Sequence, residues 1–189
     1  QGSTALLESC KNGHTECTKL LIDAGADVNA KKRNTVSALM CACKNGHTEC
    51  AKLLIDEDVN FNPECKNVKL TFIEVCKRND INTIRVLLNA GVDVNFKNSQ
   101  GWTGLMHLCK KDGKESVYLL LNAGADISIK TKYNAYAISV AQKNKKTKIV
   151  SILGWHMIRQ RVMTLAICNY WDKITTEKHY IPGGKCYLE

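Results

Sequence analysis

A period of 33 residues constrains this chain more than any other feature of its sequence. Cys10, Cys43, Cys76 and Cys109 are each 33 residues apart, and the string CKNGHTEC occurs twice, starting at Cys10 and again at Cys43. A fixed period of a few tens of residues marks a repeat architecture, in which each repeat is one small structural unit. The chain is therefore predicted to fold as a stack of similar units.

Paired apolar residues carry the period into a fifth unit, in which Gln142 stands where a fifth cysteine would be. The pairs that lie on the same 33-residue steps are Leu20/Leu21, Leu53/Leu54, Val86/Leu87, Leu119/Leu120 and Ile152/Leu153. We place the five units at about residues 3–31, 32–62, 63–97, 98–130 and 131–153. Together they form one array over residues 3–153.

Each unit has the pattern of two short helices joined by a tight turn. In the second unit, Leu39, Ala42 and Cys43 recur at helical spacing, Asn45-Gly46 interrupts the run, and apolar residues resume from Ala51. One such pair of helices cannot bury its apolar face alone, so neighbouring pairs must stack. We predict an all-α array that is stabilised by the interfaces between neighbouring units.

The composition excludes several other classes of protein. Hydrophobic residues make up 44% and charged residues 24% of the chain, with only two prolines, which is the balance of a globular protein rather than a disordered one. The apolar runs are far shorter than the ~20 residues that a membrane-spanning helix needs, so we expect no membrane span. The ten cysteines include no CxxC pair. Since a chain with an ordinary core does not depend on disulfides, we expect a reducing compartment, cytoplasmic or nuclear.

Several strings within the units resemble the ankyrin repeat, whose unit is also 33 residues long. They are Thr4-Ala5-Leu6-Leu7, Asn12-Gly13-His14, Gly25-Ala26-Asp27-Val28-Asn29 and Gly101-Trp102-Thr103-Gly104-Leu105-Met106. The resemblance covers residues 3–153. It implies an all-α ankyrin solenoid of helix-turn-helix units with β-hairpin fingers. It also implies a non-catalytic scaffold or adaptor that binds other proteins, and we expect a monomeric array.

One departure from the family concerns the start of the first helix in each unit. The proline of the T-P-L-H motif is missing throughout. The residues in its place are Ala5, Ala38, Thr71, Gly104 and Ala137. A second departure is a shortened end of unit two, followed by a surplus around Asn62-Pro63-Glu64. The finger between units two and three is therefore expected to be irregular.

The two ends of the array differ. Unit one starts abruptly at Ser3 like an internal repeat, so we expect it to be the cut end of a longer array, whereas unit five is rich in lysine, as a cap should be. After Leu153 the period stops, and an apolar stripe through Ile158, Val162 and Leu165 predicts a helix over about residues 155–171. We expect the helical tail, residues 154–189, to be either a cap on unit five or a docking element.

The repeated cysteines are expected in the core and not at a metal site. The ligands of one zinc ion lie about 2.3 Å from it, whereas residues one repeat apart are spread along the stack. Cysteine is a small apolar residue that suits the space between helices. Cys17 and Cys50 on the second helices are expected in the core too, while Cys41, Cys65 and Cys186 are expected at the surface. No catalytic, phosphate-binding or dinucleotide-binding motif is present, so we expect no enzyme, no metal and no cofactor.

A series of lysines is the clearest candidate for a binding surface. One residue after each position of the cysteine series, every unit has a lysine, and we call these five residues the lysine ladder: Lys11, Lys44, Lys77, Lys110 and Lys143. The ankyrin resemblance implies that this position lies on the concave face, where partners bind together with the fingertips. Residues 1–153 carry 22 lysines and arginines against 15 aspartates and glutamates. We therefore predict an electropositive concave face that binds an acidic segment of a protein partner.

The residues expected to contact the partner come from this face and from the fingertips. On the helices they are Lys44, Lys77, Arg78, Met106, His107, Lys110, Lys111 and Lys143, and on the fingertips Trp102 and Tyr133 supply aromatic anchors. The basic fingertip residues are Lys31, Arg33, Lys66, Lys69, Lys97 and Lys132. Two plainer interpretations stay open: the ladder as a solvated face, and Trp102 as a brace for the next hairpin.

Two other functions stay open as well. The first is binding of nucleic acid or another polyanion, with lysines on phosphates and Trp102 or Tyr133 stacking on a base. Few arginines and aromatic residues lie on the first helices of the units. Glu8 and Glu74 also interrupt the positive charge there, and both observations disfavour binding of nucleic acid. The second is a substrate-recruiting adaptor within a larger multidomain protein, such as a ubiquitin ligase or a kinase, with the tail docking the remainder.

Overall fold

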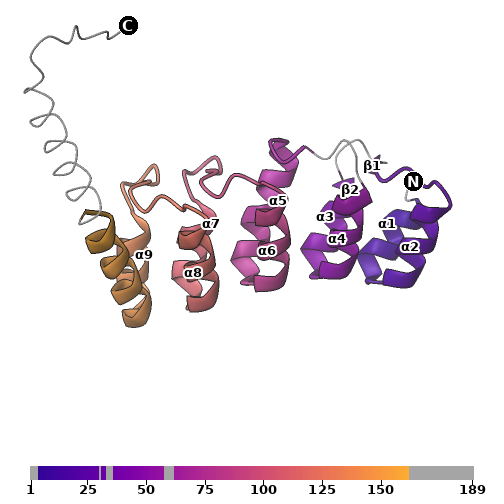
Figure 1. Ribbon diagram of the computed structural model, residues 1–189. Coiled ribbons are helices and arrows are strands. Elements are labelled where there is room, and N and C mark those ends of the chain that lie inside the picture. The colour runs from indigo at the N-terminus through magenta and orange to yellow at the C-terminus, as the bar shows by residue number, and fades with distance from the viewer. Residues whose placement is uncertain (1–3, 30, 33–35, 58–61, 162–189) are drawn as a thin grey trace, which may run out of the picture.

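The repeats form an elongated stack of helix pairs (Figure 1). The computed structural model describes residues 4–29, 31–32, 36–57 and 62–161, with the side chains of residues 31–36 outside that description. The first helix of each repeat is α1 (Ala5–Asn12), α3 (Ala38–Asn45), α5 (Lys66–Arg78), α7 (Gly104–Lys111) or α9 (Ala137–Lys143). The second helices are α2 (Thr15–Asp23), α4 (Thr48–Glu57), α6 (Ile81–Asn89), α8 (Lys114–Asn122) and a last helix over residues 147–161.

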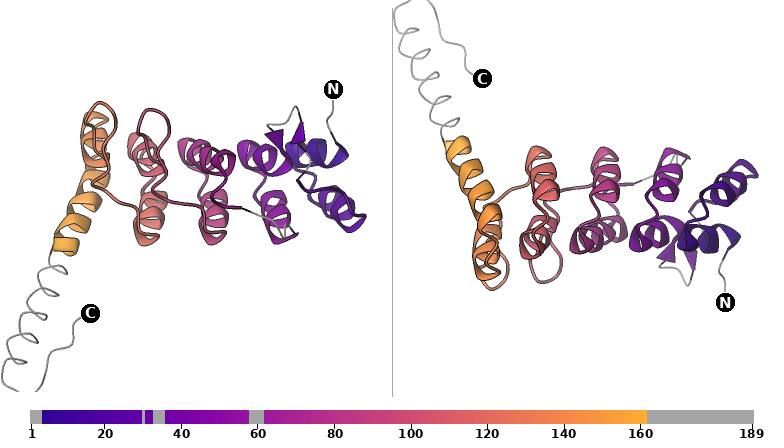
Figure 2. Two further views of the ribbon diagram at one scale, coloured as in Figure 1. Left: turned by 90° about the horizontal axis from the view of Figure 1, so that it is seen from above. Right: turned by 90° about the horizontal axis from the view of Figure 1, so that it is seen from below.

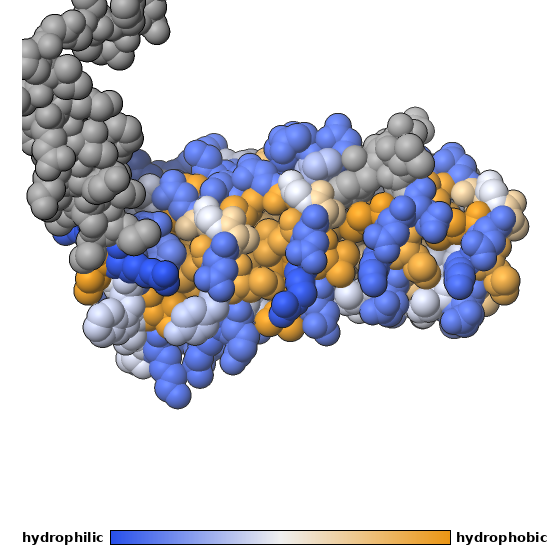
Figure 3. Space-filling model, in the orientation of Figure 1, coloured by the Kyte–Doolittle hydropathy of each residue, from blue (hydrophilic) through white to orange (hydrophobic). Residues whose placement is uncertain are grey.

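The helices lie in two rows. Each first helix contacts the first helix of the next repeat, from α1 through α3, α5 and α7 to α9, and α2, α4, α6 and α8 contact one another in the same order. Figure 2 shows the two rows from above and below. The row of second helices faces the viewer in Figure 3, where hydrophobic surface lies between ridges of hydrophilic residues. Every repeat therefore presents equivalent positions on the same face of the stack.

Local sequence signals set where the first helices begin and end. The hydroxyl groups of Thr4, Ser37 and Thr103 accept hydrogen bonds from backbone N–H groups in the first turns of α1, α3 and α7. Such caps satisfy donors that the helix itself leaves free. At the other end, Gly13 and Gly46 adopt left-handed backbone angles with φ of 75° and 80°. Glycine takes this conformation without steric cost, so it stops the helix and starts the turn.

The connections between repeats are short and only partly paired as strands. β1 (Lys31–Lys32) and β2 (Val36–Ser37) pair antiparallel, with Lys31 opposite Ser37. An isolated bridge joins Lys130 to Tyr136. The connection between α6 and α7 is instead held by the Asn98 side chain, whose oxygen accepts from the backbone N–H groups of Gln100 and Trp102. Residues 58–61 of the finger expected to be irregular lie outside the description.

Helix α5 is longer than its counterparts and corrects two predicted positions. It runs for 13 residues, against 8 in α1, α3 and α7, because the surplus after residue 61 ends at Cys65 and the helix starts at once. Lys66 and Lys69 therefore lie on a helix and not at a fingertip. The Lys69 ammonium group forms an ion pair with Glu64 and lies 5.7 Å from the centre of the Phe96 ring. With 13% of its side chain exposed, Lys69 is a structural residue.

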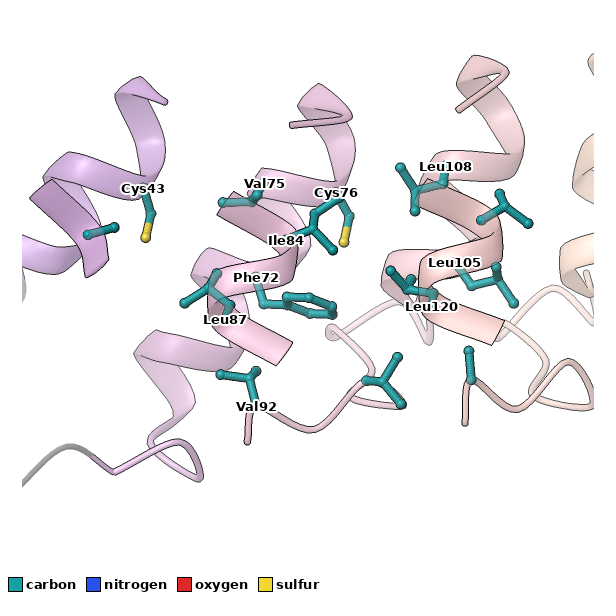
Figure 4. Packing of buried hydrophobic residues seen from close by; sticks show 14 of the residues in the cluster. Cys43, Phe72, Val75, Cys76, Ile84, Leu87, Val92, Leu105, Leu108 and Leu120 are labelled. Atoms are coloured by element: carbon teal, nitrogen blue, oxygen red, sulfur yellow. The ribbon is translucent and has the colours of Figure 1, made fainter. Parts of the chain in front are cut away.

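The four repeated cysteines lie at the centre of a core that runs along the whole stack. Cys10, Cys43, Cys76 and Cys109 are fully buried and belong to one cluster with the leucines and valines of both helix rows. Figure 4 shows the middle of this cluster, with Phe72 and Cys76 from α5 and Leu87 from α6 among its side chains. Residues that no single repeat could hide are thus covered by the next repeat.

Within this core, Phe72, the one phenylalanine of the first helices, is matched by a glycine in the next repeat. Phe72 occupies the position that is Leu6, Leu39, Leu105 or Ile138 in the other repeats. Gly104 starts the neighbouring helix α7, and a Cβ atom added there would lie 2.8 Å from the Cys76 sulfur and 3.2 Å from the Phe72 ring. Glycine at this position gives the larger side chain its space.

We expect Gly104→Ala to destabilise the array by about 1–2 kcal/mol, because overpacking outweighs the gain in helix propensity. The free energy of unfolding from urea titration measures the change. The same substitution in a Cys76→Ala background should cost clearly less, since the closest atom is gone. An equal cost in both backgrounds would contradict this packing argument.

Burial also governs the chemistry of the cysteines. Desolvation raises the pKa of Cys10 to about 11 and that of Cys43 and Cys109 to about 12, and it raises the pKa of Cys76 further. Cys50 is buried as expected. Cys17 was expected in the core but is exposed, because on the side of α2 away from α4 no described element packs against it. Cys65 is exposed, as expected, and Cys41 is half-buried.

Thiol labelling followed by peptide mapping should therefore separate two groups of cysteines at pH 7.5. Cys17 and Cys65 should react at least about tenfold faster than the four repeated cysteines, Cys10, Cys43, Cys76 and Cys109, because only a solvent-accessible thiolate is a nucleophile. After denaturation in urea the difference should vanish. Fast labelling of Cys76 in the folded protein would contradict the described core.

The last helix passes through the boundary that the sequence suggested between array and tail. Residues 147–161 form one uninterrupted helix, with Ile149 and Leu153 buried and Trp155, Met157 and Ile158 exposed. The expected division at residue 153 thus falls inside a helix. Residues 162–189, including most of the predicted tail helix, lie outside the description. In the part of the chain that is described, no helix has the length and apolar character to cross a membrane.

Candidate partner-binding site

The five rungs of the lysine ladder lie at equivalent places in the structure. Lys11, Lys44, Lys77, Lys110 and Lys143 each lie in the last turn of the first helix of their repeat. A cation there interacts favourably with the negative end of the helix dipole. The ladder therefore has a structural benefit of its own, and its value as a binding surface depends on which ammonium groups stay available.

Part of the positive charge is neutralised within the repeats. The Lys11 ammonium group lies 3.6 Å from Glu8, and that of Lys77 lies 2.5 Å from Glu74, three residues earlier on the same helix. Arg78 donates to Asp80 at 3.2 Å. Because Lys77 and Arg78 form ion pairs within the protein, they attract an acidic partner less strongly than unpaired cations would.

Four lysines of this face form no ion pair with a described residue. Among the described residues, no carboxylate lies within 4.0 Å of Lys44, Lys110, Lys111 or Lys143. The sequence supplies the reason. Where Glu8 and Glu74 stand three residues before their lysines, the corresponding residues before Lys44, Lys110 and Lys143 are Cys41, His107 and Val140.

Two hollows open between neighbouring first helices on this face. The first, with a volume of about 460 Å³, lies between α3 and α5 and is lined by Met40, Lys44, Leu70, Thr71, Glu74 and Arg78. The second has a volume of about 420 Å³, and we call it the Lys110 pocket. It is lined by Lys77, His107, Lys110, Lys111 and Asn144, from α5, α7 and the turn after α9. The two hollows give a partner side chain somewhere to enter.

His107 is the most perturbed ionisable group of the face. Its ring lies against Trp102, with 4.9 Å between the ring centres, and its Nε2 atom is buried without a hydrogen-bond partner among the described residues. Burial lowers the pKa of His107 to about 4; Lys77 and Lys110 contribute to the lowering, while Glu74 opposes it. The imidazole is therefore neutral at physiological pH and leaves a polar atom unsatisfied beside two lysines.

The predicted anchors have different environments. Trp102 is only partly exposed and packs against the core and His107, which fits the interpretation of Trp102 as a brace. Tyr133 is 81% exposed. Met106 was predicted to contact the partner, and the structure corrects this: only 1% of it is exposed, because it packs among the core residues of α7.

The remaining fingertip residues are only partly described. Lys97 and Lys132 are exposed. Lys31 lies in β1, with its side chain outside the description, and Arg33 lies outside the described residues altogether. In the described ranges, no group of three or more His, Cys, Asp or Glu side chains is placed to hold a metal ion.

The stack of similar helix pairs makes this chain a helical repeat protein. The family model described as Ankyrin repeats (3 copies) matches residues 1–67 and 72–161, which is most of the chain. The chain therefore belongs to the ankyrin repeat family, whose members generally mediate interactions between proteins. None of the curated proteins compared with the chain matches it.

The sequence indicates the ladder but not the hollows, nor which of the five lysines form ion pairs. The period alone treats the five lysines as equivalent. The ion pairs could have been predicted from the residue three positions before each lysine, since Glu8 and Glu74 are spaced for ion pairs within a helix. The Lys110 pocket depends on packing between three repeats, which no local pattern encodes.

The low pKa of His107 predicts a loss of stability in weak acid. In the unfolded chain the imidazole has a pKa of about 6.5, so between that pH and about 4 the unfolded state binds more protons than the folded state. The stability of the wild type should therefore fall as the pH drops from 6.5 towards 4. Urea unfolding at pH 7 and pH 5 should show a larger loss for the wild type than for His107→Gln; equal losses would contradict the assignment.

Proposed function

We propose that the array is a non-catalytic recognition module that binds an acidic segment of another protein along the lysine ladder. The observation that carries this proposal is the set of unpaired lysines on one face, of which Lys44 lines the first hollow and Lys110 and Lys111 line the second. An extended acidic segment could place carboxylates against successive rungs and side chains in the hollows. Electrostatic attraction would speed association and make binding sensitive to salt.

The charge distribution supports a protein segment over nucleic acid. A single-stranded nucleic acid binds best in a continuous positive groove with aromatic side chains on which bases stack. Here Lys11 and Lys77 are paired with glutamates, so the positive charge is interrupted. Trp102 is packed against His107, and Tyr133 lies near a fingertip rather than along the ladder. Discrete charges suit a segment with a few acidic residues.

Binding of labelled probes tests this proposal. Fluorescence anisotropy would compare an acidic peptide and a short RNA at 50 and 300 mM salt. The acidic peptide should bind more tightly at low salt, and the triple variant Lys44→Glu, Lys110→Glu, Lys143→Glu should weaken its binding at least about tenfold. Like charges facing the peptide would repel it.

The matched control reverses the same number of charges on the other row of helices. Lys19, Lys52 and Lys148 are exposed residues of second helices, so Lys19→Glu, Lys52→Glu, Lys148→Glu changes the net charge equally without touching the ladder. This variant should keep most of the affinity. Equal losses in both variants would mean that only net charge matters, and tighter binding of RNA would favour the nucleic-acid alternative.

We also infer a reducing compartment, the cytoplasm or the nucleus, from the cysteines. Every cysteine in the described residues is a free thiol, and the four repeated cysteines serve as core residues. Neither role needs an oxidising environment. The proposal of an adaptor within a larger multidomain protein rests on the same recognition face and adds nothing to its chemistry.

A further inference from the structure

The Lys110 pocket combines features that a simple carboxylate would not use in full. Three lysines line one cavity of about 420 Å³, together with a neutral histidine and the Asn144 amide. They come from α5, α7 and the turn after α9, so the pocket is assembled by three successive repeats. The hollow between α3 and α5 has two cationic side chains, Lys44 and Arg78, where the Lys110 pocket has three.

The net charge of the pocket is close to two. Lys77 is paired with Glu74 at 2.5 Å and is largely neutralised, whereas Lys110 and Lys111 have no carboxylate within 4.0 Å among the described residues. A carboxylate would supply one negative charge. A phosphorylated serine or threonine carries about −1.5 to −2 charges at pH 7, which matches the two unpaired lysines.

The available hydrogen-bonding groups match as well. Each lysine ammonium group carries three N–H donors and no acceptor. His107 lines the pocket as a neutral ring, with its Nε2 atom buried. A phosphoryl group has three strong acceptor oxygens, enough to accept from both lysines at once.

We propose that the Lys110 pocket binds the phosphoryl group of a phosphorylated serine or threonine in a protein segment, held by Lys110 and Lys111, with the neutral ring of His107 in the pocket wall. This inference rests on the proposed function and names its partner more closely: an acidic segment whose affinity is set by phosphorylation. The Trp102 ring packs against the imidazole of His107, with 4.9 Å between the ring centres.

A phosphorylated protein segment fits better than a nucleic-acid backbone. A nucleic acid carries a phosphate at every nucleotide and gains affinity from contacts along a track. In the neighbouring hollow, Glu74 is paired with Lys77 and Arg78 with Asp80, so Lys44 is the one lining cation there without an ion pair to a described residue. A second phosphate one repeat away would therefore meet only one matching charge, whereas a single phosphoryl group among weaker acidic contacts fits the charges of both hollows.

Three labelled peptides that differ at one residue test the proposal. Each is flanked by the same glutamates, and the central residue is phosphoserine, glutamate or serine. At 150 mM salt the phosphoserine peptide should bind at least about tenfold more tightly than the glutamate peptide, because charge-assisted hydrogen bonds are the strong ones. The variant Lys110→Ala, Lys111→Ala should remove this preference, and circular dichroism would confirm that its helices are intact.

Lys44→Ala is the matched control, since Lys44 is an unpaired rung of the ladder outside the pocket. It should weaken binding of all three peptides by a similar factor and leave the preference for phosphoserine unchanged. A second readout comes from ¹⁵N NMR of the histidine rings. The His107 signals should shift in a saturable way with the phosphoserine peptide and should stay in place with the serine peptide.

The possible results separate the two proposals. If phosphoserine and glutamate peptides bind equally and both depend on the ladder, the pocket proposal is wrong while the proposed function stands. If no acidic peptide binds, both are wrong. A short RNA that displaces the phosphoserine peptide with higher affinity would overturn the protein partner in favour of nucleic acid.

Discussion

The contact between the first helices of successive repeats is the interaction on which the rest of this structure depends. A pair of helices with 7 to 13 residues in its first member is too small to bury its own apolar side chains. The cysteine series fills this contact with a side chain small enough for close approach, and Phe72 against Gly104 shows how tightly neighbouring repeats adjust to each other. Because each interface fixes the next repeat, the order of the stack and the spacing of its surface residues follow from the same packing.

Polar contacts between repeats reinforce that spacing beside the ladder. The His47 ring bonds the carbonyl group of Lys11 at 3.1 Å, which joins the end of α1 to the start of α4. The hydroxyl groups of Thr48 and Thr83 lie 2.8 Å apart and link α4 to α6 in the same way. The end of α1, which carries Lys11, is therefore tied to the following repeat, and α4 and α6 are linked at their first turns. Such contacts hold the surface in place before a partner arrives, which lowers the cost of ordering it on binding.

Within this regular frame, substitutions at single positions decide what each rung does. A glutamate three residues before the lysine turns the rung into an internal ion pair, as at Lys11 and Lys77. A histidine at that position, His107, supplies no carboxylate, so Lys110 has no ion pair of this kind, and the ring packs against Trp102 and lines the pocket. The pocket is thus a local exception to the repeat, and a family assignment by itself says nothing about it.

The sequence by itself determined the repeat length, the two-helix unit, the buried cysteines and the common position of the five lysines, because each of these follows from periodicity within a single unit. Only the tertiary structure decided what depends on neighbours. It extended α5 over Lys66 and Lys69, buried Met106, exposed Cys17 and carried the last helix past residue 153. It also decided which ladder lysines stay unpaired and where a pocket opens. Burial and charge at these positions are properties of the interface between repeats, and a pattern read along one unit does not contain that interface.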